Sequence, residues 1–593
     1  MFSAERRKLL ASLLQGSLRW FAGCILAGVA LTVCELLVPQ VIVLCVDTAV
    51  GGAAPAAGTI AAFIYALLGG RVTARALALG LLALGAVSAL CRYLAHALNA
   101  RAGETLVKTL RDRLYAHIQK LPWSWHQSNA TGDIIQRCTS DVEIIKTFFQ
   151  QQFVSVFRIV VLILMAMSFM LSMNPRLSLI AVIFTPIVVA YSLYFHRRIR
   201  ERFEICDENE GILSTIAQEN LTGVRVVRAF GREEFERRRF ETQNQLYTEY
   251  WMELCRTLAR FWSVCDVSSG VQVLLVVVLG AVMCVRGSLT AGEYIAFISY
   301  NFMLLWPVRR LGRMIAEMSK AGVSVDRISA ILSAEPERDA VNAAEAPMDG
   351  DIRFEHVSFR YGEGPEVLRD LSFTIPAGKS FGILGGTGSG KSSLIHLLCR
   401  LYAPTEGRIT VGGTDIAAMP AEWVRRNVGV VLQEPFLFSR SIGENIGICG
   451  ADAEEIRRAA VTACIAGDVD DMTQGFDTLV GERGVTLSGG QKQRVAMART
   501  LTLHTPVLIF DDSLSAVDTE TDAAIREGLA RRTEGTTTVI ISHRITTLLD
   551  CDTVLVLDRG ELSELGTPAE LYARGGIYRR IYDIQMDGEE AEA

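Results

Sequence analysis

Hydrophobic residues are unevenly distributed along this chain of 593 residues. Before residue 312 they form runs close to the roughly 20 residues that cross a bilayer as a helix. From residue 350 onward the apolar runs are shorter and alternate with polar residues, beginning with a strand-like pattern at Gly350. The pattern predicts an all-α transmembrane domain over residues 1–330, a polar linker over 331–349, and a separate α/β domain over 350–593.

Six apolar stretches of the first half are predicted to span the membrane. The loops after the second and fourth spans are long, so we expect their flanking helices to continue into the cytosol. Each loop has a break in its middle, at 121–126 and at 219–223, which suits a short crosswise helix. The alternative is a cytosolic subdomain in these loops, for which strand signals are sparse. The predicted spans are 21–46, 77–98, 154–173, 177–195, 267–285 and 295–311.

The distribution of Lys and Arg predicts the orientation of these spans. Residues 99–152 carry seven and residues 196–261 carry twelve, whereas the opposite connections carry only Arg71, Arg75, Arg176 and Arg286. The positive-inside rule then places both termini and both long loops in the cytoplasm. The first apolar run is too long for a cleavable signal peptide. We therefore expect a multi-pass protein of the cytoplasmic (inner) membrane, in contact with membrane lipids.

Ionisable side chains within a span usually face a cavity or a partner. Glu35 and Asp47 lie in the first predicted span, His96 lies in the second, and Asp266 lies at the inner edge of the fifth. Glu35 is the sharpest candidate for contact with a transported molecule because it lies mid-span. A pair or hydrogen bond between helices is an equally open interpretation of the same residue.

Composition excludes several other kinds of protein. Half of the residues are hydrophobic and the mean hydropathy is +0.28, which is high for a soluble protein. The net charge of −6 gives no support for nucleic-acid binding. The thirteen cysteines are scattered and odd in number, so they are interpreted as reduced, mostly buried residues and not as a disulfide or zinc framework.

A phosphate-binding loop is the strongest chemical signal in the chain. The stretch 385–393 fits the pattern G-x-x-x-x-G-K-[ST] and lies between an apolar strand and an apolar helix. Its backbone N–H groups and the following helix start favour an anion. Lys391 is expected to reach the β- and γ-phosphates of a nucleotide, and Ser392 is expected to bind Mg²⁺. The predicted nucleotide-binding residues here are Gly385, Gly386, Thr387, Gly388, Ser389, Gly390, Lys391, Ser392 and Ser393.

Further signals follow in order around this loop. Tyr361 precedes it, where an aromatic face could stack on adenine, and Gln433 follows a later strand, where its amide could reach Mg²⁺ or a water. A second anion-binding helix start is predicted at Ser488, Gly489, Gly490 and Gln491.

Two carboxylates and a histidine complete the predicted site. The strand 507–511 ends in Asp511, a carboxylate suited to Mg²⁺, and Asp512 follows it directly. His543 ends the strand 538–542.

Taken together, these motifs resemble those of the ATP-binding cassette exporters, and the resemblance spans the whole chain. It implies a six-helix transmembrane domain of exporter type followed by a P-loop ATPase domain with a helical subdomain. In that family the elements above are the adenine-stacking loop, Walker A, the Q-loop, the signature motif, Walker B and the switch histidine. The resemblance implies ATP and Mg²⁺ as cofactors, Gln433, Asp512 and His543 as catalytic residues, and Ser392, Gln433 and Asp511 as metal ligands.

The chain has one phosphate loop and one signature motif, so it supplies half of each of two sites. In this family a nucleotide lies between the Walker A loop of one subunit and the signature of the other. We therefore expect a second half-transporter as partner, two ATP molecules at the interface, and alternating access to a membrane cavity.

One position departs from the family pattern. The residue after the Walker B aspartate is usually glutamate, the general base, and here it is Asp512. Its carboxylate is retracted by about 1.5 Å, so hydrolysis at this site is expected to be slow. With an intact signature at Ser488, this resembles the degenerate-site subunit of a heterodimeric exporter whose partner carries the glutamate.

Several alternatives remain open at this stage. The chain could form a homodimeric exporter with slow hydrolysis, or an ATP-gated regulator or channel, a class that Asp512 favours. An importer of siderophores with the exporter fold ranks lower because no extra binding domain is evident. The cargo of an exporter would be a small amphipathic drug, a lipid or a peptide, and cavity residues do not name it.

Overall fold

The computed structural model describes residues 16–50, 62, 65–66, 73–481, 484, 486–513, 519–532 and 535–592. The chain divides into two compact units. The first contains Met1–Lys120 and Asn129–Glu335, and the second contains Leu121–Ser128 and Pro336–Ala593. The short helix α5 (Trp123–Ser128), at the predicted break of the first long loop, therefore groups with the second unit.

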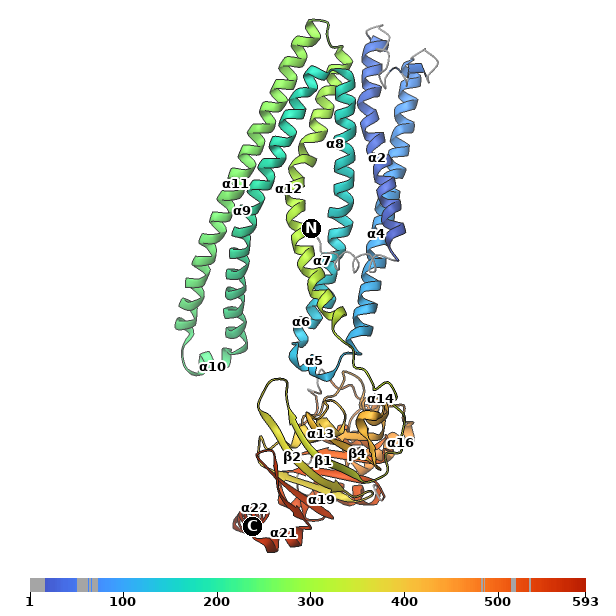
Figure 1. The fold of residues 1–593 in the computed structure, drawn as a ribbon. Helices are drawn as coiled ribbons and strands as arrows, with labels where there is room; N and C mark the ends of the chain where they lie inside the picture. The colour runs from blue at the N-terminus through green and yellow to red at the C-terminus, as the bar shows by residue number, and fades with distance from the viewer. Residues whose placement is uncertain are drawn as a thin grey trace. The chain divides into compact units, whose positions relative to one another are not determined.

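The first unit is built from long helices, four of which have 43 residues or more. In Figure 1, α9 and α11 run side by side and the short helix α10 joins them at one end. These helices are about twice as long as a bilayer requires, a length that the predicted extensions into the cytosol need. The elements are α2 (Leu18–Leu44), η1 (Cys45–Val50), α4 (Ala74–Ile118), α6 (Thr131–Gln136), η2 (Arg137–Asp141), α7 (Val142–Thr147), η3 (Phe148–Phe153), α8 (Val154–Met173), α9 (Pro175–Thr222), α10 (Val224–Ala229), α11 (Glu233–Val285) and α12 (Ala291–Ser333).

Each of the six predicted spans lies within this set of helices. Among the described residues, five helical stretches are long and apolar enough to cross a membrane: Leu18–Thr48, Arg75–Ile118, Thr131–Met173, Pro175–Thr222 and Glu233–Val285. The predicted sixth span in α12 is not among these five. Six spans therefore remain a prediction.

Local signals set the turns between these helices. Asn174 caps α9, because its Oδ1 accepts hydrogen bonds from the N–H groups of Arg176 at 3.1 Å and Leu177 at 3.2 Å. The start of α12 has a capping box formed by Thr290 and Glu293. The buried Asp47 carboxylate reinforces it, accepting from the Thr290 hydroxyl at 2.6 Å and the Gly292 N–H at 2.8 Å. Asp47 is thus bound to a helix end.

Two sheets form the centre of the second unit. A four-stranded antiparallel sheet has the order β2-β1-β4-β5, and a six-stranded sheet has the order β10-β9-β3-β8-β7-β6. In the second sheet β9, β3, β8, β7 and β6 are parallel neighbours, so their carboxyl ends meet at one edge. The strands are β1 (Ile352–Arg360), β2 (Glu366–Ile375), β3 (Ser380–Gly385), β4 (Glu406–Val411), β5 (Thr414–Asp415), β6 (Val428–Val431), β7 (Val507–Asp511), β8 (Thr537–Ser542), β9 (Thr553–Asp558) and β10 (Glu561–Gly566).

Three apolar clusters hold this unit together. One joins both sheets to α13, the second lies in the helical part around α16 and α18, and the third packs α20 to α22 on β3 and β9. This is the predicted α/β domain with a helical part. Its helices are α13 (Lys391–Leu398), η4 (Ile416–Ala418), α14 (Ala421–Asn427), α15 (Ile442–Ile446), α16 (Ala453–Thr462), α17 (Ala466–Asp470), η5 (Gly475–Asp477), α18 (Gly489–Leu501), α19 (Thr519–Arg532), α20 (Ile545–Leu548), α21 (Pro568–Arg574) and α22 (Ile577–Glu592).

Candidate functional site

The predicted phosphate loop connects β3 to α13, as its strand–loop–helix context requires. Gly390 has φ +104° and a Cβ there would lie 2.5 Å from Leu368 Cδ2, so only glycine fits. Gly388 has φ +79° and open space around it. The loop therefore curls tightly on its inner side and stays open at Gly386 and Gly388, where a phosphate chain could approach the backbone.

Two side chains of the loop show what it is suited to bind. The Lys391 ammonium donates to the carbonyls of Gly385 at 2.7 Å and Gly386 at 2.8 Å, and burial lowers the pKa of Lys391. The Ser389 hydroxyl is buried and has no partner among the residues that the structure describes. A half-buried cation and an unpaired hydroxyl in a glycine-rich loop fit an anionic ligand with several oxygen atoms.

The carboxylates predicted to act with this loop lie two strands away in the same sheet. Asp511 ends β7, and β8 separates β7 from β3. Burial, and secondly repulsion from Asp512, raise the pKa of Asp511 to about 6, while the charge of Lys391 opposes that shift. A buried carboxylate with too little compensating charge is a suitable ligand for a divalent cation.

Asp512 and His543 are brought together by neighbouring strands. Asp512 has a left-handed backbone, with φ +45°, and its N–H donates to the carbonyl of Ile541 in β8 at 2.9 Å. Its Oδ1 lies 2.9 Å from Nδ1 of His543, which directly follows β8. This hydrogen bond orients the imidazole so that Nε2 is the ring nitrogen directed away from Asp512.

Tyr361 lies beside the phosphate-loop helix α13 and contacts that helix through its hydroxyl group. The hydroxyl is 2.9 Å from Ser393 Oγ and 3.2 Å from His396 Nδ1, both in α13. The edge-to-face neighbours of its ring are Phe359 and Tyr402, with centroids at 4.7 Å and 5.1 Å. The prediction of adenine stacking on Tyr361 remains untested, and its contact with Ser393 was not foreseen.

The remaining predicted residues lie on the helical part. Ser488 and Gln491 form a capping box at the start of α18. Ser488 and Gly489 are exposed there, and Gly490 and Gln491 are half-buried. Gln433 is exposed, and its carbonyl accepts a hydrogen bond from Gln493 of α18 at 3.4 Å. The described contacts do not bring either group to the phosphate loop of the same chain.

Sequence reasoning missed Gln585, which holds the switch segment from the C-terminal helix α22. Its Nε2 donates to the carbonyl of His543 at 2.8 Å, and its Oε1 accepts from the N–H of Ile545 at 2.8 Å. No motif marks a glutamine 42 residues beyond His543. Only the packing of α22 on β9 and α20 brings the two together.

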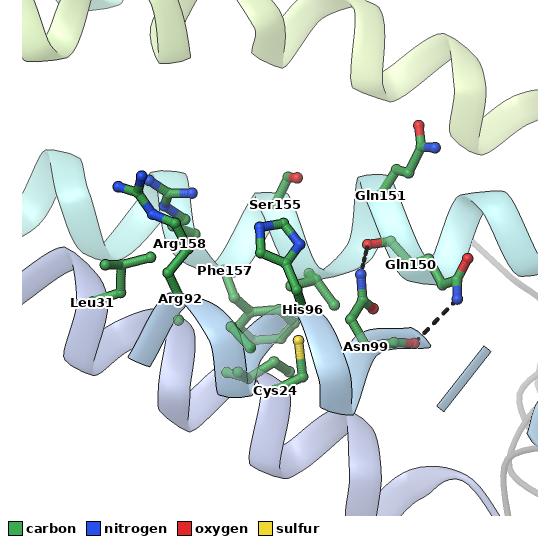
Figure 2. A pocket seen from close by; sticks show the side chains of 14 residues that line it. Cys24, Leu31, Arg92, His96, Asn99, Gln150, Gln151, Ser155, Phe157 and Arg158 are labelled. Atoms are coloured by element: carbon green, nitrogen blue, oxygen red, sulfur yellow. Dashed lines mark hydrogen bonds between the residues drawn. The ribbon is translucent and has the colours of Figure 1, made fainter. Parts of the chain in front are cut away.

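The structure also shows what Glu35 contacts in the first unit. Glu35 of α2 forms ion pairs with Arg92 of α4 and Arg158 of α8, each at 3.0 Å. Figure 2 shows the two arginines side by side at one end of a pocket that His96 also lines. Arg92 and Arg158 lie within predicted spans and were overlooked in the sequence. The pairing interpretation of Glu35 is therefore the one observed.

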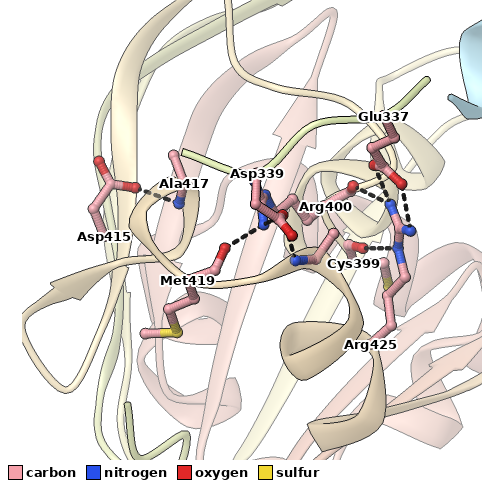
Figure 3. A network of polar contacts seen from close by, with 9 residues as sticks. Glu337, Asp339, Cys399, Arg400, Asp415, Ala417, Met419 and Arg425 are labelled. Atoms are coloured by element: carbon pink, nitrogen blue, oxygen red, sulfur yellow. Dashed lines mark hydrogen bonds and ion pairs between the residues drawn. The ribbon is translucent and has the colours of Figure 1, made fainter. Parts of the chain in front are cut away.

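The stretch predicted as a linker is anchored to the second unit beyond Glu335. The Glu337 carboxylate binds both terminal nitrogens of Arg425, at 2.7 Å and 2.8 Å, and Asp339 accepts from Arg400 at 2.8 Å (Figure 3). Arg425 also donates to the Arg400 carbonyl at 2.7 Å, directly after the phosphate-loop helix α13. These bonds fix residues 337–339 to that helix end.

Comparisons with known proteins agree with this geometry. The family profile "ABC transporter transmembrane region" matches residues 6–308, and "ABC transporter" matches residues 368–515. The ABC transporter ATP-binding protein YwjA of Bacillus subtilis is 34% identical over 530 residues, which cover 88% of this chain and 92% of that protein. The ATP-dependent lipid A-core flippase of Chromohalobacter salexigens is 33% identical, with 82% and 84% covered.

A solved structure shows the same architecture. The structure of a bacterial Atm1-family ABC exporter with ATP bound matches with a TM-score of 0.80 and 27% identity, covering 96% of this chain and 98% of that one. Both halves of the sequence and the fold thus point to one family. The chain belongs to the ABC transporter family, as an exporter half-transporter whose transmembrane domain is fused to a C-terminal ATPase domain that binds ATP and couples its hydrolysis to transport.

Proposed function

We propose that this chain is the degenerate-site subunit of a heterodimeric exporter, paired with a second half-transporter that carries glutamate where this chain has Asp512. The observation that carries the proposal is the short carboxylate of Asp512, held at 2.9 Å by His543. A general base must come within roughly 2.6–3.2 Å of its proton, and a carboxylate retracted by about 1.5 Å does not reach a water placed for glutamate. Hydrolysis at this chain's Walker motifs is therefore slow.

In this proposal each ATP lies between the phosphate loop of one subunit and the signature of the other. Lys391 contacts the β- and γ-phosphates, and the Ser488 helix start completes the partner's site. The buried Asp511 and the Ser392 hydroxyl, with Gln433, would hold Mg²⁺, which neutralises phosphate charge when bound. This chain thus contributes a weak site and completes a competent one.

The dimer closes when ATP bridges the two cassettes and opens after hydrolysis. The long helices of each subunit carry this motion to a cavity that faces alternate sides of the cytoplasmic membrane. The Lys- and Arg-rich loops support a cytoplasmic position for both termini. Relatives named as a lipid A-core flippase and a probable multidrug resistance transporter support an amphipathic cargo.

ATPase measurements on the purified chain, alone and co-purified with its partner, test the proposal. Alone, the chain should hydrolyse ATP slowly, and Asp512→Glu should raise the rate about tenfold or more, because the base then reaches the water. The Asp512→Asn variant should leave the rate of the pair nearly unchanged. A partner-free dimer that transports, or an Asp512→Glu gain of about twofold or less from a normal exporter rate, would contradict it.

A second candidate is an ATP-gated regulator or channel, which Asp512 favours because nucleotide would then only hold a conformation. Transport measurements in inverted membrane vesicles distinguish an exporter from an ATP-gated channel. ATP-dependent, saturable uptake against a gradient indicates an exporter, whereas flux that runs only down a gradient while ATP is bound indicates a gate.

A further inference from the structure

A pocket of about 380 Å³ lies between three helices of the first unit. Its walls come from α2, α4 and the segment where η3 continues into α8. That volume is within the range of small-molecule sites. All of its lining residues belong to one compact unit, so its shape does not depend on how the two units are arranged.

One end of this pocket carries an excess of positive charge. Arg92 and Arg158 each bond the Glu35 carboxylate at 3.0 Å, one to each oxygen atom. Among the described residues no second carboxylate pairs with either arginine, so two guanidinium groups share one negative charge. His96 also lines the pocket and can add a further positive charge when protonated. The pocket end therefore has a formal charge of at least +1.

Pairing with Glu35 alone does not explain why two arginines lie at this end of the pocket. A charge inside a span is costly and is retained where it faces a partner or a cavity. One arginine would suffice to pair Glu35, yet both side chains remain accessible, at 60% and 48% of their surface in the single chain, while Glu35 is 24% exposed. The two arginine side chains, which carry the uncompensated charge, are therefore accessible from the pocket, whereas the Glu35 carboxylate is the more buried partner.

The rest of the pocket is mixed in character. Leu31 and Phe157 give it apolar walls beside the arginines (Figure 2). At the other end Asn99 and Gln150 are joined by two hydrogen bonds, of 3.0 Å and 3.1 Å. Asn99 Oδ1 is buried there, and it has no hydrogen-bond partner within the described part of the chain. An occupant that spans the pocket meets two cations at one end and the hydrogen-bonded pair of Asn99 and Gln150 at the other.

We infer that this pocket binds the anionic head group of an amphipathic cargo, a phosphate or carboxylate, and that Glu35 holds the two arginines until the head group displaces it. The inference rests on the proposed exporter function and names the class of its cargo. Arg92 and Arg158 supply charge-assisted hydrogen bonds, which are about twice as strong as neutral ones. Glu35 competes with the cargo for them and so favours its release.

Binding of radiolabelled dodecyl phosphate to the full-length protein in phosphatidylcholine nanodiscs, without nucleotide, tests this inference separately from ATP hydrolysis. Replacing both arginines, as Arg92→Gln with Arg158→Gln, should weaken binding about tenfold or more, because two charged donors are lost. Glu35→Gln should strengthen it, because the competing carboxylate is removed. Arg176→Gln, an exposed arginine at the start of α9, is the matched control and should leave binding unchanged.

Competitors identify the chemistry of the ligand. Dodecyl phosphate should be displaced by unlabelled dodecyl phosphate, and far less by dodecyltrimethylammonium or inorganic phosphate. Displacement by phosphatidylglycerol supports a membrane lipid as the source of the head group, and its absence supports a free amphiphile. Equal binding of the cationic amphiphile, equal competition by inorganic phosphate, or weaker binding in Glu35→Gln overturns the inference. Slow ATPase activity of the same preparation, raised by Asp512→Glu, leaves the proposed function standing even where dodecyl phosphate does not bind.

Discussion

Single carboxylates perform distinct physical tasks in this molecule. Asp47 binds the start of α12, and Asp552 joins two strands of the ATPase domain. Asp552 accepts from the N–H and hydroxyl of Ser380, both at 2.9 Å, and from the Lys379 ammonium at 3.3 Å. The backbone N–H of Ser380, and then the two side chains, hold the pKa of Asp552 below its usual value. This carboxylate therefore stabilises the start of β3 in its ionised form.

The lowered pKa predicts how stability depends on pH. The contribution of Asp552 is present above the unfolded pKa of about 4 and is lost as pH falls through the lower folded value. Asp552→Asn should reduce the free energy of unfolding by about 1 kcal/mol at pH 7. Thermal unfolding of both proteins should show this difference shrinking below about pH 4. Asp558→Asn, at the exposed end of β9, is the control, and a difference that is constant with pH would refute the assignment.

An unexpected contact between elements is made by the C-terminal helix α22. α22 packs on the apolar cluster of β9 and α20, with Tyr578 fully buried, and this packing presents Gln585 to the backbone on both sides of Arg544. Two hydrogen bonds of 2.8 Å then fix the segment that follows β8. The position of His543 thus depends on a helix that carries no nucleotide motif.

Removing the two hydrogen bonds of Gln585 should slow ATP turnover and leave ATP affinity largely unchanged. In the purified Asp512→Glu chain without its partner, where turnover depends on this site, Gln585→Ala should lower kcat about tenfold through the loss of two hydrogen bonds, with a much smaller change in KM. Gln585→Glu keeps an acceptor for the N–H of Ile545, so its kcat should lie between those of Gln585→Ala and the parent protein. Ile584→Ala, at an exposed position of the same helix, should behave like the wild type. Equal changes in kcat for both alanine variants would show a general effect of α22 instead.

Much of this architecture follows from local sequence patterns, and the contacts that do not are tertiary. The strand–loop–helix around Lys391 and the helix Val154–Met173 coincide with their predictions, because glycine placement and apolar runs determine them locally. The ion pairs of Glu35 with Arg92 and Arg158 form only when three helices pack together. The hydrogen bonds of Gln585 to the His543 segment form only when the whole ATPase domain has folded. Neither leaves a spacing signal in the chain.

At the scale of the whole molecule, the proposed dimer gives each half-transporter complementary halves of two ATP sites. The exposed capping box at Ser488 and the phosphate loop at Lys391 belong to different sites in the proposed dimer, so substitutions at them should have unequal effects. The membrane unit adds a charged pocket whose occupancy would be coupled to those sites by linkage.

The inequality of the two sites can be measured in the co-purified pair. Ser488→Arg should reduce ATPase activity of the pair about 100-fold, because it blocks the helix start that completes the competent site. Lys391→Ala should reduce it far less, because it affects the slow site. Photolabelling with an azido-ATP analogue should show that the Ser488→Arg chain still binds nucleotide through its own phosphate loop. Equal losses in both variants would indicate two equivalent sites.

The attachment of Glu337 and Asp339 has a practical consequence for dissecting the protein. An isolated ATPase domain that starts at Gly350, where the strand pattern begins, would leave Arg400 and Arg425 without their carboxylates at the end of the phosphate-loop helix. A fragment that starts at Pro336 retains both salt bridges. It is the shorter piece, starting at Gly350, that should express poorly and lose nucleotide affinity.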